Sequence, residues 1–174
     1  RIAAMLLLTL RGTPTLYNGE ELGMTDGHVP LHRIQDPQGL NLGAERSRDG
    51  CRTPLQWDAS PYAGFSTVEP WLPVGEQYPT VNAATESQDP RSMLTLYTRL
   101  LALRRASPEL HIGTYHAVDA PDGVFAYVRE DAGKAFLVAL NFTDESKTLT
   151  LEKGGTLTLS THLDREGETL NDSL

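Results

Sequence analysis

The sequence has one cysteine, no long hydrophobic run and no cluster of positive charge. Cys51 alone cannot form an internal disulfide, and no Cys and His residues share the spacing of a metal site. The longest apolar run, Ile2 to Leu8, has seven residues, well short of the roughly 18 that a membrane span needs. The formal net charge is -8, and no basic run extends beyond Arg104 and Arg105. We therefore expect no metal, no cofactor, no nucleic acid and no membrane as partners, and we expect a neutral or cationic ligand.

Several catalytic patterns are also missing. No Gly-rich loop precedes a helix and no Ser lies in a G-x-S-x-G turn, which excludes the familiar phosphate cradles and nucleophile elbows. Glu20 and Glu21 are adjacent in a segment that we expect to be extended, so their side chains point to opposite sides and cannot converge on one atom. Asp36, Asp49 and Asp58 could each reach a cleft, but nothing in the sequence pairs them as two catalytic carboxylates.

Both ends predict that the chain is part of a longer protein. The chain starts at Arg1, directly at an apolar run that no helix-capping residue precedes. Asn171-Asp172-Ser173 is a turn signal that ought to lead into another strand. No signal peptide is recognisable, and the single cysteine favours the cytoplasm.

The first part of the chain predicts the second half of an α/β repeat. Arg1 to Leu10 is rich in Ala, Met and Leu on all sides, which is typical of a helix packed on both faces, and Gly12 is placed to end it. Thr13 to Tyr17 predicts a short buried strand that Asn18-Gly19 ends. Such strands lie parallel in a sheet, so this one needs neighbours that the chain does not supply.

Residues Glu20 to Gln88 show no sustained periodicity. A connection of this length is either disordered or functional. Its aromatic residues argue against disorder. In α/β barrels the loops after the carboxyl ends of strands build the active site, so we expect a long active-site loop here.

The second half of the chain predicts one helix and then a β domain. Asp89-Pro90 is a helix start and Arg104 and Arg105 occupy its last turn. After Leu110 the pattern changes to period two, which predicts a small antiparallel sandwich. The expected strands are Gly113 to Val118, Val124 to Glu130, Ala135 to Phe142, Lys147 to Leu151 and Thr156 to Thr161. We expect one domain over residues 1-108 and an incomplete β domain over 109-174.

The run RDGCRTPLQWD, Arg48 to Asp58, follows neither a helical nor a strand period and predicts a shaped loop. The planar donor fork of Arg52 can span neighbouring hydroxyls or a carboxylate. An ordinary structural interpretation is also open, in which Arg52 pairs with an acid and Trp57 fills a small core under the loop.

This run resembles glycoside hydrolase family 13, the α-amylase superfamily, together with RGTPTLYNGEELGM (Arg11 to Met24), AGFS (Ala63 to Ser66), PWLPV (Pro70 to Val74) and LYTRLLALRRASPEL (Leu96 to Leu110). The order of the runs is similar to that in its oligo-1,6-glucosidase and α-glucosidase branch. The resemblance implies the end of a (β/α)8 TIM barrel followed by a small antiparallel β-sandwich.

The resemblance also implies a retaining α-glucosidase that removes terminal α-linked glucose from short oligosaccharides. It places the nucleophile, the acid/base and the transition-state Asp upstream of Arg1, so we expect no catalytic residue here and no activity from this chain alone. Arg52 matches the arginine that holds the non-reducing glucose, and Glu21 matches a structural acid at the end of the last strand. Trp57 and Trp71 are expected to lie in the core of the loop.

Two alternatives are also compatible with the sequence. A trehalose synthase or sucrose isomerase would share the fold and the retaining chemistry. A non-catalytic family member, such as the heavy subunit of an amino-acid transporter, would not need a sugar-binding arginine, so the intact RTPLQW run argues against it.

Overall fold

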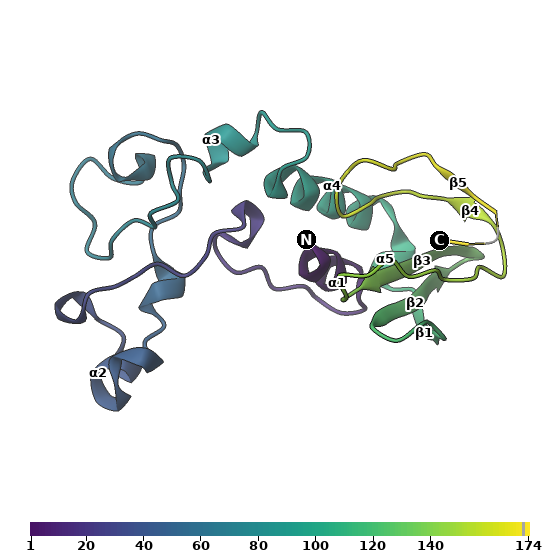
Figure 1. Cartoon of the computed structure of the whole chain (residues 1–174), viewed down its shortest axis with the longest axis horizontal. Coiled ribbons are helices and arrows are strands. Elements are labelled where there is room, and N and C mark those ends of the chain that lie inside the picture. Colours follow the sequence, from purple (N-terminus) through teal and green to yellow (C-terminus); the bar gives the residue numbers. More distant parts are fainter. Residues whose placement is uncertain (172) are drawn as a thin grey trace. The chain divides into compact units, whose positions relative to one another are not determined.

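The computed structural model describes residues 1-171 and 173-174, and these form two compact units. The first unit joins Arg1–Thr15 with Leu96–Leu174, and the second is Leu16–Thr95. Figure 1 labels the α-helices and strands of both. The predicted domain boundary at residue 108 concerns the whole protein and stays a prediction.

The first unit begins with helix α1, Ile2–Thr9. Its apolar residues favour a helix, and Ala4, Met5 and Leu8 are buried. The predicted strand at Thr13 to Tyr17 is wrong, because none of these residues is assigned to a strand. A strand forms only where a neighbour supplies backbone hydrogen bonds, and none of the described residues does so here.

Helix α4, Met93–Ala106, is the main helix of the chain, and it begins three residues later than the sequence predicts. The carboxylate of Asp89 accepts the Arg91 N–H at 2.8 Å, while the hydroxyl of Ser92 accepts the Thr95 N–H at 3.0 Å. Ser92 is therefore the residue that caps the helix. Basic residues Arg104 and Arg105 occupy the last turn as expected, and a short helix α5, Pro108–His111, follows.

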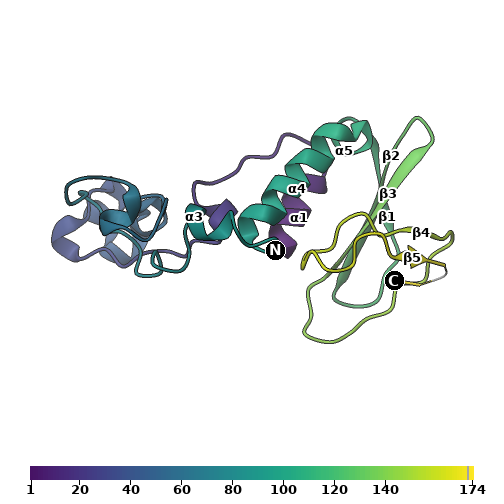
Figure 2. The same ribbon diagram turned by 90° about the horizontal axis from the view of Figure 1, so that it is seen from above.

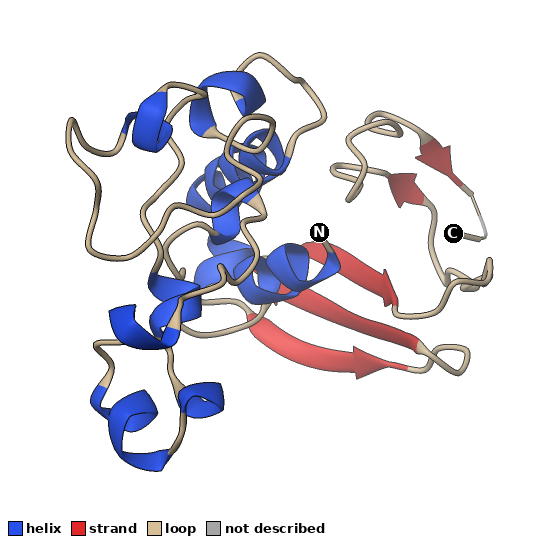
Figure 3. Cartoon of the chain, turned by 60° about the vertical axis from the view of Figure 1, so that its left-hand side comes forward, coloured by secondary structure: helices blue, strands red, loops and turns tan. Residues whose placement is uncertain are grey.

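The β region is centred on an antiparallel sheet with the strand order β1-β2-β3 (Figure 3). Strands β1 (Thr114–Val118), β2 (Val124–Asp131) and β3 (Lys134–Asn141) confirm the first three predicted strands. The two-residue turn between β2 and β3 has φ values of 48° at Ala132 and 79° at Gly133. Positive φ at both positions is the geometry that suits the twist of a tight hairpin.

The last two predicted strands are mostly wrong. In the segment Lys147 to Leu151 only Thr150 forms a bridge, to Ser173. Of the predicted segment Thr156 to Thr161, only Thr156 lies in a strand, the two-residue β4 (Gly155–Thr156), which pairs with β5 (Thr169–Leu170). Leu157 still bonds to the backbone of Gly167 and Glu168. At Ser160, the N–H donates to the Glu166 side chain at 2.8 Å, so a local turn replaces the ladder there.

Two buried arginines, one on α4 and one on β2, connect the elements of the first unit by hydrogen bonds. The guanidinium of Arg104 donates to the carbonyls of Leu8 (2.8 Å), Leu10 (3.1 Å) and Gly12 (2.6 Å). Arg129, on β2, is fully buried and donates to carbonyls from α1, α5 and β1. Its shortest bond, 2.6 Å, is to the carbonyl of Thr9. Figure 2 shows α1 beside α4.

The bonds to Leu8, Thr9 and Leu10 satisfy carbonyls that a helix leaves unpaired at its C-terminus, and the positive charges are favourable at that end of the helix dipole. Burial lowers the pKa of both guanidiniums, and for Arg129 the nearby charge of Arg104 lowers it further. An arginine remains protonated despite such shifts. The sheet and α4 are thus both held against the end of α1 by charge-assisted bonds.

The second unit is a chain of short helices without a strand among its described residues. None of its helices exceeds six residues, which fits the absence of periodicity in the sequence. The helices are η1 (Glu20–Leu22), η2 (Leu31–Arg33), α2 (Pro37–Leu42), η3 (Ala44–Arg46), η4 (Asp49–Arg52), η5 (Pro61–Gly64) and α3 (Ala83–Glu86). Within the described ranges, no helix of either unit is long and apolar enough to span a membrane.

Replacement of Arg104 by Met tests the role of the buried guanidinium. We expect the full-length protein to lose about 3 kcal/mol of stability, because up to three carbonyls lose their donors while the apolar stem is kept. Arg105→Met is the matched control, since Arg105 is exposed on the same helix turn. Urea unfolding of both variants measures the difference, and equal midpoints would contradict the proposed role.

Candidate substrate-binding loop

The loop that carries Arg52 is attached to the rest of the second unit by a buried carboxylate. The side chain of Asp36 is fully buried, whereas that of Arg48 is half exposed. Two guanidinium nitrogens of Arg48 donate to the two oxygens of Asp36, at 2.9 and 2.6 Å, and the Arg48 N–H adds a third bond at 2.7 Å. This bidentate geometry is the strong form of an ion pair.

Asp36 also caps helix α2, since its Oδ1 accepts the Gln38 N–H at 3.3 Å. The hydrogen bonds from the Arg48 side chain and backbone hold the pKa of the Asp36 carboxyl far below its usual range, against the opposing effect of burial. Asp36 is therefore ionised at neutral pH and serves as a structural anchor. It is not available as a catalytic acid.

Asp49 is a second buried carboxylate with the same kind of role. Its Oδ2 accepts the backbone N–H groups of Gln35 (2.8 Å) and Asp36 (2.9 Å). Burial raises the pKa of Asp49, but these two backbone donors and Ser47 lower it more, so the net shift is downward. Asp36 and Asp49 are thus brought together, as parts of one network that attaches residues 48-49 to residues 35-36.

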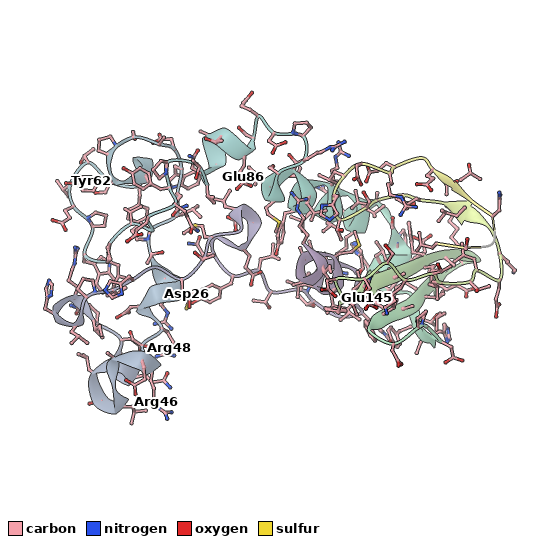
Figure 4. All side chains as sticks on the ribbon, viewed as in Figure 1. Asp26, Arg46, Arg48, Tyr62, Glu86 and Glu145 are labelled. Atoms are coloured by element: carbon pink, nitrogen blue, oxygen red, sulfur yellow. The ribbon has the colours of Figure 1, made fainter. Side chains whose placement is uncertain are left out.

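Arg52 ends η4 directly after this network, and its side chain is exposed. Among residues 1-171 and 173-174, no hydrogen bond or ion pair to the Arg52 side chain is found. The ion pair that the sequence suggested for Arg52 is made instead by Arg48. Gly50 allows the backbone to come close to Gly27, whose N–H donates to the Gly50 carbonyl at 2.9 Å. Figure 4 marks Arg48 and Arg46 near α2.

The residues after Arg52 fix the loop from inside. Thr53 and Gln56 are buried, and the Gln56 amide donates to the Val81 carbonyl at 2.5 Å. The main chain of Trp57 bonds at 2.9 Å to both Ala63 and Ala84. Trp57 is nevertheless 52% exposed and Trp71 is 65% exposed, so the prediction that both lie in the loop core is wrong.

Glu20 and Glu21 lie in the short helix η1, and the predicted extended segment is wrong at this point. The Glu21 carboxylate accepts the Gly19 N–H at 2.9 Å, which closes the turn at the start of η1. Gly19 has a φ of 93° and allows this turn.

Asp58 is not part of the network of Asp36 and Asp49. Its Oδ1 instead accepts the Ser60 N–H at 2.8 Å.

Two known protein families match most of the chain. The family described as "Alpha amylase, catalytic domain" matches residues 1-113, and "Beta-galactosidase C-terminal domain" matches residues 123-171. These matches define a class, the barrel glycosidases with a C-terminal β domain. The chain belongs to the α-amylase family, glycoside hydrolase family 13, and the predicted fold class is confirmed.

The relatives include the glucosidase branch that the sequence resembles. The chain is 36% identical to the glucan 1,6-alpha-glucosidase of Streptococcus pneumoniae, over 86% of the chain and 31% of the relative. It is 39% identical to Maltase A1 of Drosophila melanogaster, over 86% of the chain and 27% of the relative. The chain thus spans about a third of the length of the curated relatives it matches.

Solved structures agree with this assignment. The trehalulose synthase of Pseudomonas mesoacidophila superposes with a TM-score of 0.85 at 33% identity, over 99% of this chain and 35% of that chain. The isomaltulose synthase of Klebsiella sp. LX3 also has a TM-score of 0.85, at 28% identity over the same shares of the two chains. The superposition extends over the loop as well as the β domain.

The Asp36 anchor predicts a defined pH dependence of stability. Because the folded-state pKa of Asp36 is lowered, its contribution is complete above the ordinary carboxyl pKa of about 3.9 and is lost as the pH falls below it. We expect Asp36→Asn to lower the melting temperature of the full-length protein at pH 7, with a smaller difference at pH 3.

Asp26→Asn is the control for this experiment, since Asp26 is an exposed aspartate of the same unit whose carboxylate makes no hydrogen bond or ion pair in the described chain. Thermal unfolding at pH 7, 5 and 3 measures all three proteins. A difference between Asp36→Asn and the parent that stays constant over this range would show that the ion pair with Arg48 does not stabilise the fold.

Proposed function

We propose that the full-length protein is a retaining α-glucosidase that removes terminal α-linked glucose from short oligosaccharides, and that Arg52 binds this glucose. The observation that carries the proposal is the environment of Arg52. It is an exposed arginine without a partner among residues 1-171 and 173-174, held next to the buried anchors Asp36 and Asp49. Membership of family 13 and the names of the relatives support the same activity.

The arrangement suits recognition of a neutral sugar. The N–H donors of a guanidinium lie in one plane, so two of them can bond to two neighbouring hydroxyls of a sugar. The position of the guanidinium is best defined when the backbone that carries it is held in place. Arg48 and Asp49 use their polar groups to hold the backbone, so Arg52 keeps its own donors for a ligand. An oligosaccharide is also compatible with a chain whose net charge is -8, which does not favour anionic substrates.

The chemistry would be double displacement through a covalent glucosyl intermediate, with the catalytic carboxylates supplied by residues outside this chain. Arg52 would orient the glucose ring and strengthen its hydrogen bonds as the transition state forms. Activity of the isolated chain would contradict this division of roles. A cytoplasmic location stays a prediction.

Substitution of Arg52 by Ala in the full-length protein tests the proposal. A hydrogen bond from a charged donor contributes roughly 1.5-3 kcal/mol, so kcat/KM for a chromogenic α-glucoside should fall about 10- to 150-fold. Arg46→Ala is the control, because Arg46 is an exposed arginine of the same loop whose side chain likewise has no partner in the described part of the chain. Equal kcat/KM values for the two variants would refute the role of Arg52.

An isomerase activity is the second candidate, since trehalulose and isomaltulose synthases are among the structural neighbours. Incubation of the full-length protein with sucrose, followed by chromatography of the products, separates the two. Glucose and fructose in equal amounts indicate hydrolysis, which we expect. If a rearranged disaccharide is the main product, the protein is a sucrose isomerase and the α-glucosidase proposal is wrong.

A further inference from the structure

The loop contains a left-handed turn at Tyr62, Ala63 and Gly64. Their φ values are 58°, 58° and 65°, and the ψ values of Tyr62 and Ala63 are 27° and 28°. Left-handed backbone is natural for Gly64, but it is disfavoured for alanine and more so for a bulky tyrosine. Residues held in such conformations cluster at functional sites, because the surrounding structure must enforce them.

The enforcing contacts come from the end of the RDGCRTPLQWD run. The Ala63 carbonyl accepts two backbone N–H groups, from Trp57 at 2.9 Å and from Asp58 at 3.2 Å. The Ala63 N–H donates to the Ser60 carbonyl at 2.9 Å. Ala63 is completely buried, while its neighbours Tyr62 and Phe65 are 37% and 50% exposed. The strained backbone therefore places two aromatic rings at the surface.

These rings border a pocket of about 710 Å³. Its other main lining residues are Pro61 and three hydroxyl residues, Ser60, Ser66 and Thr67, and no lining residue is charged. An adjoining pocket of about 560 Å³ shares Pro61 and Tyr62 but is bordered by the ion pair of Arg33 and Glu69. Figure 4 marks Tyr62 in this part of the loop, apart from Arg46 and Arg48.

An uncharged pocket with aromatic faces and hydroxyls has the chemistry of a site for a neutral polyol. Pockets of this size hold small ligands, with apolar surfaces for contact and a few polar groups for orientation. The apolar face of a sugar ring can lie on a tyrosine or phenylalanine ring, while its hydroxyls bond to Ser and Thr side chains. An anionic ligand would find no positive group among the residues that line this pocket.

We propose that Tyr62 and Phe65 form a binding site for a glucosyl unit of an oligosaccharide. The identity of the ligand rests on the proposed function, since the glucosyl class is taken from it. The site would extend recognition beyond the single glucose assigned to Arg52 and would favour longer chains. The left-handed turn is the device that presents the Tyr62 ring.

Three variants of the full-length protein distinguish the effect of losing an aromatic ring from the effect of changing the strained backbone. Tyr62→Gly removes the ring and suits the positive φ, so its loss of binding is not caused by added strain. Ala63→Gly is the matched control, because it relieves the same turn and keeps the ring. Phe65→Ala removes the second ring, at a position with ordinary right-handed backbone angles, φ -75° and ψ -38°.

Initial rates are measured with a chromogenic α-glucoside, which has one glucosyl unit, and with isomaltotriose and maltotriose. We expect Tyr62→Gly and Phe65→Ala to raise KM for the trisaccharides about tenfold, the size of effect that an aromatic contact gives. The kcat values and the KM for the chromogenic substrate should stay unchanged, as should all constants of Ala63→Gly. Unchanged trisaccharide KM values in both ring variants would overturn the site.

Binding of isomaltotriose by saturation-transfer NMR distinguishes this failure from failure of the proposed function. If the protein hydrolyses no α-glucoside, the α-glucosidase proposal fails, yet a loss of saturation transfer in Tyr62→Gly would still support the site. If hydrolysis occurs and the ring variants bind and turn over every substrate like the parent, the site alone fails. A lowered melting temperature with unchanged binding would assign the rings to packing and would also overturn it.

Discussion

The unpaired carbonyls at the end of α1 are the constraint on which the first unit depends. A helix leaves its last carbonyl groups without internal partners, and here they lie in an interior that admits little water. Arg104 and Arg129 bring donors to the carbonyls of Leu8, Thr9 and Leu10 from two different elements, α4 and β2. The sheet and the long helix are therefore both bonded to the end of α1, and Leu8, Leu100 and Tyr127 from these three elements are buried.

In the loop, unpaired backbone N–H groups are satisfied by negatively charged carboxylates. Its backbone has few regular hydrogen bonds, so buried carboxylates accept the N–H groups that no strand or long helix would pair. Asp36 and Asp49 thereby replace secondary structure as the source of rigidity. A rigid loop without regular elements can hold a charged group such as Arg52 at a chosen place, which is a common way to build a recognition site.

Strain and rigidity are connected in this loop. The same run that holds Arg52 ends at Trp57 and Asp58, whose N–H groups hold the left-handed turn at Ala63. A buried backbone with satisfied hydrogen bonds can support unfavourable angles at Tyr62 because release of the strain would break those bonds. One continuous segment thus carries both of the groups that we assign to sugar binding.

Much of the fold could be predicted from residue patterns of short range. The composition of α1, the start and end signals of α4 and the alternation in β1, β2 and β3 each indicate the element, because these patterns depend only on residues that are close in the sequence. Predictions failed where the state of a segment depends on a partner. Thr13 to Tyr17 has the composition of a strand but no strand beside it, and Lys147 to Leu151 forms one bridge instead of a ladder.

The sequence by itself determined the family, the absence of a disulfide and the importance of the run from Arg48 to Asp58, since these depend on residue identities alone. The tertiary structure decided which residues of the run have which role. It assigned the ion pair to Arg48, left Arg52 exposed and turned Asp36 and Asp49 into anchors. It also placed Tyr62 in a left-handed turn. The pairing of a charged group depends on distance and burial in three dimensions, and the sequence specifies neither directly.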